Sequence, residues 1–254
     1  MNLTEVLHAT PFMALHRWLA RRVLGRADYI VTFSHITTQT ARKEFPHHPI
    51  ASIAGLPFNS RQKNRQPSRE TARRALQLEG KVILFFGFVR SYKGLGDLIE
   101  AFPEVLHHHP DATLVVAGEF WKDKSTYLDA IERLGISSRV RVMDHYIPED
   151  QVASLFSAAD VVVLPYRSIS QSGVIPLAFA FGTPVIATRV GGNIDWIEDG
   201  KNGYLVSPHS PSALANAIHQ FFSLRKSGTF RKGIATKIAE MEWNAQKESV
   251  VLQA

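Results

Sequence analysis

The amino-acid sequence predicts an α/β protein with a doubly wound parallel sheet, accompanied by part of a second α/β domain. Apolar runs of four to seven residues alternate with helical patterns of ten to fifteen residues over about 75–240, which indicates repeated strand–helix–strand units. These runs are apolar throughout, as the strands of a sheet covered by helices on both faces must be.

The first elements predict only the end of a domain, over 1–58. An amphipathic pattern predicts a helix that stops at Gly25. The elements expected here are a helix over 12–25, a strand over 28–34, a helix over 37–45 and a strand over 49–55. The first helix is interpreted as packing on its own domain. The alternatives are contact with an anionic membrane surface, or association through an exposed apolar face.

Positive charge is concentrated where the two domains would join. The chain carries a net charge of +6, of which +5 lies in 60–74, whereas 75–254 carries −2. A nucleic-acid-binding domain would spread such charge over a folded face, so nucleic acid is excluded as a partner. We expect a solvated basic linker at 59–74 that runs into a helix, and an anionic membrane or substrate is the alternative partner of its charges.

The second domain is expected over 75–240. Its predicted strands lie at 82–88, 112–118, 139–144, 160–166, 184–189 and 203–207. Its predicted helices lie at 94–109, 124–135, 148–159, 172–182, 211–225 and 228–240, with a short turn or helix at 193–199. A separate last helix is expected at 243–252, within a segment 241–254 that crosses back to the first domain.

The amino-acid composition excludes several kinds of catalytic site, metal site and membrane segment. The 254 residues include no Cys, which excludes thiol catalysis, disulfides and Cys-ligated metal centres. No apolar run approaches the ~18 residues that span a bilayer, and the first fifteen residues lack the basic start of a secretory signal. A cytoplasmic protein is therefore expected, with peripheral membrane contact as the alternative.

The loop after the first strand of the second domain suits a diphosphate. Ligands of doubly wound sheets bind at the carboxyl ends of the strands. Gly87, Arg90 and Lys93 stand there directly before a helix, where cations and open backbone can bind phosphates. The alternative is a solvated turn.

Two further loops fall at the same edge of the sheet. Ser170, Gln171, Ser172 and Gly173 precede Val174 at a helix start, where N–H groups favour phosphate. The alternative is ordinary capping by serine. The glycines at 191–192 permit close backbone approach in the third loop.

Five strings resemble one protein family. They are GxxRxYKGLxDLIEAF, LVVAGE, YIPEDQVASLFSAADVVVLPY, QSG followed by AFAFGTPVIATRVGG, and DGKNGYLVSP. Together, over about 81–222, they resemble the donor-binding, Rossmann-like half of a retaining family 4 glycosyltransferase of the GT-B fold, and 27–45 is similar to the end of the other half. The resemblance implies metal-independent transfer of a sugar, without cofactor, from a nucleotide diphosphate sugar to an acceptor. The acceptor would be a sugar or a lipid-linked glycan in the synthesis of cell-surface polysaccharide or glycoconjugate.

The resemblance also implies roles for residues. Arg90 and Lys93 would hold the donor diphosphate, and the helix start at 172–174 would donate N–H groups to it. Tyr146 and Ile147 would line the base. Glu119, Ser170 and Gln171 would lie near the sugar and ribose, with an exposed loop carboxylate as the alternative reading of Glu119. No catalytic residue is assigned.

The sequence departs from the family pattern at the site itself. The two glutamates that many members carry fall on Ile169 and Leu177, which places the chain in a subset with QSG in that loop. Phe88 stands where members have a basic residue. Because only the end of the first domain is present, two alternatives stay open. They are a non-catalytic nucleotide-sugar-binding module or subunit of a split enzyme and, with less support, a nucleotide-sugar epimerase of the GT-B fold.

Overall fold

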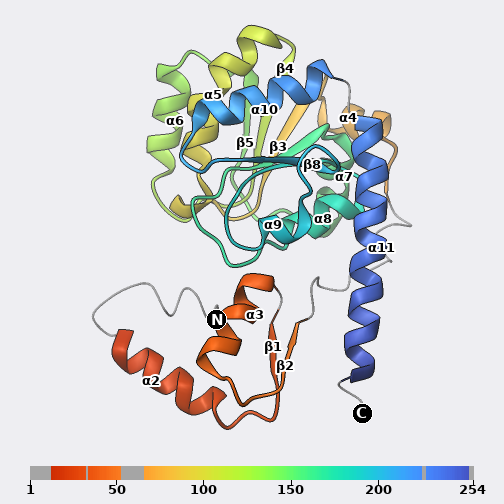
Figure 1. Cartoon of the computed structure of the whole chain (residues 1–254). Helices are drawn as coiled ribbons and strands as arrows, with labels where there is room; N and C mark the ends of the chain where they lie inside the picture. The colour runs from red at the N-terminus through yellow and green to blue at the C-terminus, as the bar shows by residue number, and fades with distance from the viewer. Residues whose placement is uncertain (1–12, 33, 53–65, 225–226, 252–254) are drawn as a thin grey trace.

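Six parallel strands form the main sheet, in the order β5-β4-β3-β6-β7-β8 (Figure 1). The computed structural model describes residues 13–32, 34–52, 66–224 and 227–251. The strands are β3 Lys81–Phe86, β4 Ala112–Ala117, β5 Val140–Met143, β6 Val161–Leu164, β7 Val185–Thr188 and β8 Gly203–Val206. The predicted doubly wound sheet is thereby confirmed. Its winding reverses between β3 and β6, the position where such sheets bind ligands.

Helices cover both faces of this sheet because its strands are apolar on both sides. The covering helices are α4 Arg69–Leu76, α5 Leu95–His108, α6 Lys124–Arg133, α7 Glu149–Ala158, α8 Val174–Ala180 and α10 Pro211–Ser223. Ile83 and Phe85 of β3 point into the core under α5 and α10, whereas Val82 and Leu84 point into the core under α7 and α8. This alternation follows from the two-residue period of a strand.

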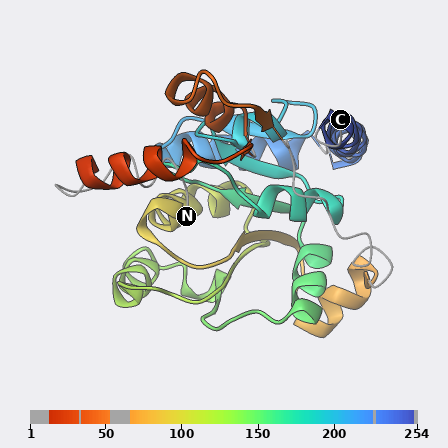
Figure 2. The same ribbon diagram turned by 90° about the horizontal axis from the view of Figure 1, so that it is seen from below.

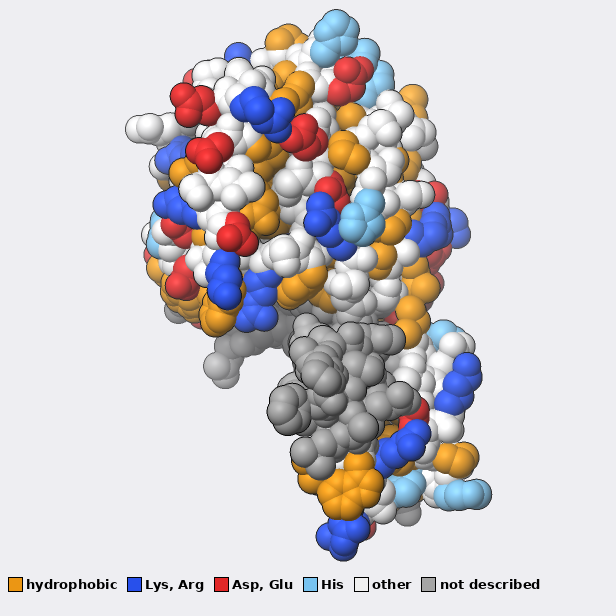
Figure 3. Space-filling model, turned by 90° about the vertical axis from the view of Figure 1, so that its left-hand side faces the viewer, with side chains coloured by type: hydrophobic (Ala, Val, Ile, Leu, Met, Phe, Trp, Pro, Cys, Tyr) orange, Lys and Arg blue, Asp and Glu red, His pale blue; other side chains and the backbone are white. Residues whose placement is uncertain are grey.

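A smaller α/β unit precedes the main sheet. It comprises α2 Met13–Leu24, β1 Ile30–Thr32, α3 His35–Glu44 and β2 Ile50–Ser52. β1 and β2 are parallel, with Ile30 opposite Ile50. Trp18 and Val23 of α2 are exposed, so hydrophobic side chains stand on the surface at the tip of this unit (Figure 3).

The end of the chain differs from the expectation of two helices. One continuous helix, α11 Ser227–Val251, replaces them, and Figure 2 shows it end-on beside the six-stranded domain. Residues 234–251 contain neither Gly nor Pro, so nothing interrupts the helix there. No helix in the described parts of the chain is both long and apolar enough to cross a bilayer.

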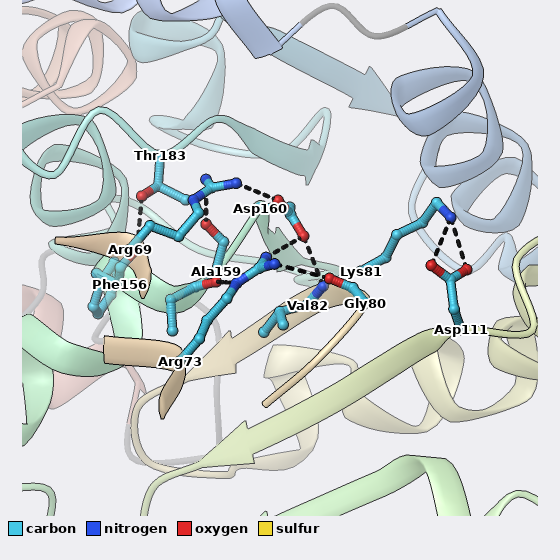
Figure 4. Close-up of polar contacts among 11 residues, drawn as sticks. Arg69, Arg73, Gly80, Lys81, Val82, Asp111, Phe156, Ala159, Asp160 and Thr183 are labelled. Carbon is cyan, nitrogen blue, oxygen red and sulfur yellow. Dashed lines mark hydrogen bonds and ion pairs between the residues drawn. The ribbon is translucent and has the colours of Figure 1, made fainter. Parts of the chain in front are cut away.

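Part of the expected basic linker is folded. Arg69 and Arg73 lie in α4 and form ion pairs with Asp160, at 2.5 and 2.7 Å (Figure 4). Residues 69–74 thus belong to a helix, as expected where the linker runs into one, and Arg69 and Arg73 are not solvated because a carboxylate 91 residues from Arg69 holds them. Residues 53–65, which include 59–65 of that linker, lie outside the described residues. The division into domains otherwise stays a prediction.

Candidate functional site

Two glycines form the floor of the site at the carboxyl ends of β3 and β4. Gly87 and Gly118 have φ of +98° and +142°, values that side chains other than hydrogen rarely allow. A Cβ on Gly118 would lie 2.4 Å from the Gly87 carbonyl oxygen, and a Cβ on Gly87 would lie 2.9 Å from Lys93 Nζ. Glycine at both positions therefore lets the backbone and the Lys93 ammonium approach each other closely.

Lys93 is a buried cation above this floor. It ends the short 3-10 turn Ser91–Lys93 and is only 9% exposed. Its Nζ lies 5.6 Å from the centre of the Tyr166 ring. Among the described residues no carboxylate pairs with it. Burial, and then repulsion by Arg90, lowers the pKa of Lys93 to about 8. A buried ammonium without a carboxylate is a binding position for an anion.

Arg90 points in a different direction from Lys93. Its guanidinium lies 4.9 Å from the centre of the Trp121 ring, an exposed side chain that the sequence analysis did not single out. Arg90 and Trp121 line an open cavity of about 350 Å³. The other lining residues are Val89, Ser91, Tyr92, Lys122, Asp123 and Tyr127. Figure 3 shows Lys and Arg side chains at this edge of the six-stranded domain, which faces the smaller unit. Arg90 is thus held at the rim of the site, whereas Lys93 is buried beside Gly87 and the Tyr166 ring.

The loop after β6 brings its own polar groups to the site. Tyr166 connects the two loops, because its ring faces Lys93 and its hydroxyl lies beside Ser172. Burial raises the pKa of Tyr166, so its hydroxyl stays protonated at neutral pH. Ser172 Oγ accepts a hydrogen bond of 3.3 Å from the Val174 N–H. Helix α8 begins only at Val174, so Gly173 caps it.

Two buried amide atoms in this region have no partner among the described residues. They are Gln171 Nε2 and Asn193 Oδ1. A buried polar atom without a hydrogen bond costs about 1–3 kcal/mol, so an additional polar group is expected there. The backbone is close-packed around them, because a Cβ on Gly191 would lie 1.5 Å from the Ile169 carbonyl oxygen. Gln171, a predicted site residue, thus has an unused hydrogen-bond donor among the described residues.

The remaining predicted residues lie on the β4–β5 side. Tyr146 follows β5 and is 72% exposed, and its neighbour Ile147 is buried. Glu119 follows β4 and is exposed. Its backbone carbonyl accepts from Val89, a bond of 2.9 Å that ties the loops after β3 and β4 together. An exposed aromatic ring at this position can stack on a base.

The smaller unit contacts the loop after β7, beside the candidate site. The His35 N–H at the start of α3 donates to Asp195 Oδ2 of the short helix α9, Asn193–Trp196, over 2.8 Å. A Cβ on Gly192 would lie 3.2 Å from the Ser34 Cβ. Asp195 was missed because nothing in the sequence connects it with a residue 160 positions earlier. Among the described residues, no group of three or more His, Asp or Glu side chains could hold a metal ion.

Comparison with known protein families and curated proteins finds glycosyltransferases in both cases. A family model described as glycosyl transferases group 1 matches residues 80–223. A D-inositol 3-phosphate glycosyltransferase from Corynebacterium glutamicum is 30% identical over 223 residues, which cover 82% of this chain and 52% of that protein. A putative glycosyltransferase, YtcC, from Bacillus subtilis is 30% identical over 80% of this chain and 53% of its own length. The chain spans about half the length of these curated relatives.

Solved structures agree on the fold. Anabaena HepE in complex with UDP superposes with a TM-score of 0.82 over 98% of this chain and 70% of that one, at 21% identity. The C-terminal domain of a group 1 glycosyl transferase, LpcC, from Francisella tularensis has a TM-score of 0.63 over 70% of this chain and 96% of its own, at 24% identity. With a six-stranded Rossmann-like sheet and a family match over most of it, this chain belongs to the group 1 (family 4) glycosyltransferases of the GT-B fold.

Proposed function

We propose that this chain binds a nucleotide diphosphate sugar at the carboxyl ends of β3, β4 and β6, and that the enzyme it represents transfers the sugar to an acceptor with retention of configuration. Lys93 is the observation that carries the proposal. It is a buried cation with no carboxylate partner among the described residues, and it stands over a floor that only glycine permits. Relatives of this chain are named as glycosyltransferases, and a protein of the same fold binds UDP.

The residues of the site have distinct roles in this proposal. When the bond between the sugar and the diphosphate breaks, its electron pair stays on the phosphate oxygen, and negative charge grows on the leaving nucleotide. Lys93 stabilises that charge at close range, and Arg90 does so from the rim. The acceptor hydroxyl forms the new bond on the same face of the sugar, and its proton passes to the leaving phosphate oxygen. Gln171 and Ser170 contact the sugar or ribose, where the usual family glutamates are missing.

A nucleotide panel tests this proposal. UDP, GDP and ADP are titrated into the folded chain by calorimetry, each beside its nucleoside. We expect one of the diphosphates to bind, and to bind more tightly than its nucleoside, because the phosphates provide the negative counter-charge for the Lys93 ammonium. If all three diphosphates fail to bind a folded sample, the donor site is disproved.

Tyr146 provides a second prediction. If its exposed ring stacks on the base, the substitution Tyr146→Ala should weaken the binding of nucleoside and nucleotide diphosphate by the same factor, about tenfold, since base stacking contributes about 1–3 kcal/mol. The matched control is Trp121→Ala, which removes another exposed ring of the same face and should leave nucleoside binding unchanged. Loss of diphosphate binding alone in Tyr146→Ala would assign Tyr146 to the phosphates instead.

A further inference from the structure

A second cavity with basic lining lies at the opposite end of the sheet from the candidate donor site. Its volume is about 380 Å³, and its lining residues are Gln66, Pro67, Arg69, Ser157, Phe181, Gly182, Thr183 and Arg231. Thr183 stands just before β7, which places the cavity at the amino ends of the strands. Two of the lining residues are arginines, and none is acidic.

The nearest carboxylate is already shared. Asp160 accepts from Arg69 at 2.5 Å, from Arg73 at 2.7 Å and from the Val82 N–H at 2.8 Å (Figure 4). The second terminal nitrogen of Arg69 donates to the Ala159 carbonyl oxygen. One negative charge therefore neutralises only part of the charge of two arginines, and its acceptor positions are occupied.

Arg231 adds a third positive charge that nothing balances. It forms no ion pair with any residue in the described part of the chain. The residues three and four positions away along α11 are Ser, Gly, Ile and Ala, so no partner is available on its own helix. Burial lowers the pKa of Arg69, and although Asp160 raises it, repulsion by Arg73 and by Arg231 lowers it again. Three guanidinium groups, those of Arg69, Arg73 and Arg231, thus share the single carboxylate of Asp160. Two of them line the cavity, so the excess positive charge favours an anion between Arg69 and Arg231.

We propose that this cavity is a second anion site, which binds a phosphoryl group through Arg231, the remaining N–H groups of Arg69 and the Ser157 hydroxyl. Ser157 is half-buried and has no hydrogen-bond partner in the described regions. The Thr183 hydroxyl is not a candidate, because it donates to the Phe156 carbonyl oxygen over 3.0 Å. The phosphoryl group belongs either to a free phosphate or diphosphate or to the headgroup of an anionic lipid.

Such an anion would join three segments that are distant in the sequence. Arg69 lies in α4, Ser157 in α7 and Arg231 in α11. Helix α11 runs from the six-stranded domain down to the level of the smaller unit (Figure 1). Occupancy of the cavity would thus fix the first turns of α11 to the six-stranded domain, at a site separate from the one that contains Lys93.

The test uses the full chain with Lys93→Met as its background, so that the candidate donor site binds the diphosphate only weakly. Pyrophosphate is titrated by calorimetry into this protein, into a version with Arg231→Gln and into one with Lys232→Gln. Lys232 is the adjacent exposed lysine on α11 and does not line the cavity. Loss of one charged hydrogen-bonding partner should raise the pyrophosphate Kd about tenfold or more for Arg231→Gln. Lys232→Gln should leave it unchanged.

Vesicle sedimentation distinguishes the two sources of the phosphoryl group. The three proteins are spun with phosphatidylglycerol vesicles and, as a control, with phosphatidylcholine vesicles. Binding to phosphatidylglycerol that Arg231→Gln abolishes and Lys232→Gln retains supports the site and identifies a lipid headgroup as its ligand. The proposal is overturned if neither pyrophosphate nor phosphatidylglycerol binds, or if Arg231→Gln and Lys232→Gln behave alike in both measurements.

Discussion

Replacement of Asp160 by alanine is expected to lower the free energy of unfolding by about 2–4 kcal/mol, because it leaves several donors without their acceptor. Arg69 and Arg73 of α4 and the Val82 N–H of β3 all donate to this carboxylate. The side chain of Asp160 is 18% exposed, so the arginines cannot recover the interaction fully from water. Urea unfolding of the wild type and of Asp160→Ala measures the difference.

A neighbouring ion pair provides the control for Asp160. Asp111 pairs with Lys81 at 2.7 Å, in the same view (Figure 4), but the side chain of Asp111 is 50% exposed. Asp111→Ala is therefore expected to cost less than about 1 kcal/mol. Equal losses for Asp111→Ala and Asp160→Ala would contradict the conclusion that α4 is held to the sheet by the Asp160 contacts.

Lys93→Met is expected to have opposite effects on binding and on stability. Removal of the ammonium should raise the Kd of the nucleotide diphosphate by about ten- to a hundredfold, the usual contribution of a charge-assisted hydrogen bond. The same change should raise the free energy of unfolding of the unliganded protein by about 1–3 kcal/mol near neutral pH, because a buried charge without a partner is replaced by an apolar chain of similar length.

The pH dependence of this stability effect has a definite sign. The pKa of Lys93 in the folded protein is lowered from the ordinary 10.5 to about 8. Below pH 8 the lysine is charged in both the folded and unfolded states, and the full cost of burying the charge is present. Between pH 8 and 10.5 the folded state loses its proton first, so the cost is progressively relieved. The stability gain from Lys93→Met, measured by urea unfolding, should therefore be largest below pH 8 and shrink above it.

The sheet could be predicted from the sequence because neighbouring residues along the chain determine each of its strands and helices. β3, β4, β6, β7 and β8 are short runs of mostly apolar residues, and the helices between them have apolar faces at helical spacing. β5 also contains the exposed Arg141. The single helix α11 was predicted as two, although 234–251 contains no breaker. Its glycine at 233 has a packing reason, since a Cβ there would lie 2.4 Å from the Lys201 carbonyl oxygen.

The site could be predicted only in part, because some of it depends on contacts distant in sequence. Gly87, Arg90 and Lys93 fall in one loop, and this loop identified them, whereas Gly118 follows the next strand, β4. That Lys93 is buried while Arg90 stacks on Trp121 depends on the packing of β3 against β4. The contacts of Asp160 with α4 and of Asp195 with α3 join residues 87 to 160 positions apart, and no local pattern marks either carboxylate.

The most direct test of the donor site is calorimetric titration of the nucleotide diphosphate at pH 7 and at pH 9.5, with the wild type and with Lys93→Met. If the charged Lys93 holds the diphosphate, the wild type should bind more weakly at pH 9.5 by about tenfold, because its free-state pKa near 8 leaves the lysine mostly neutral there. Lys93→Met should bind weakly and almost equally at both pH values. Equal pH dependence in the two proteins, or unchanged diphosphate affinity in Lys93→Met, would contradict the assignment of Lys93 to the diphosphate.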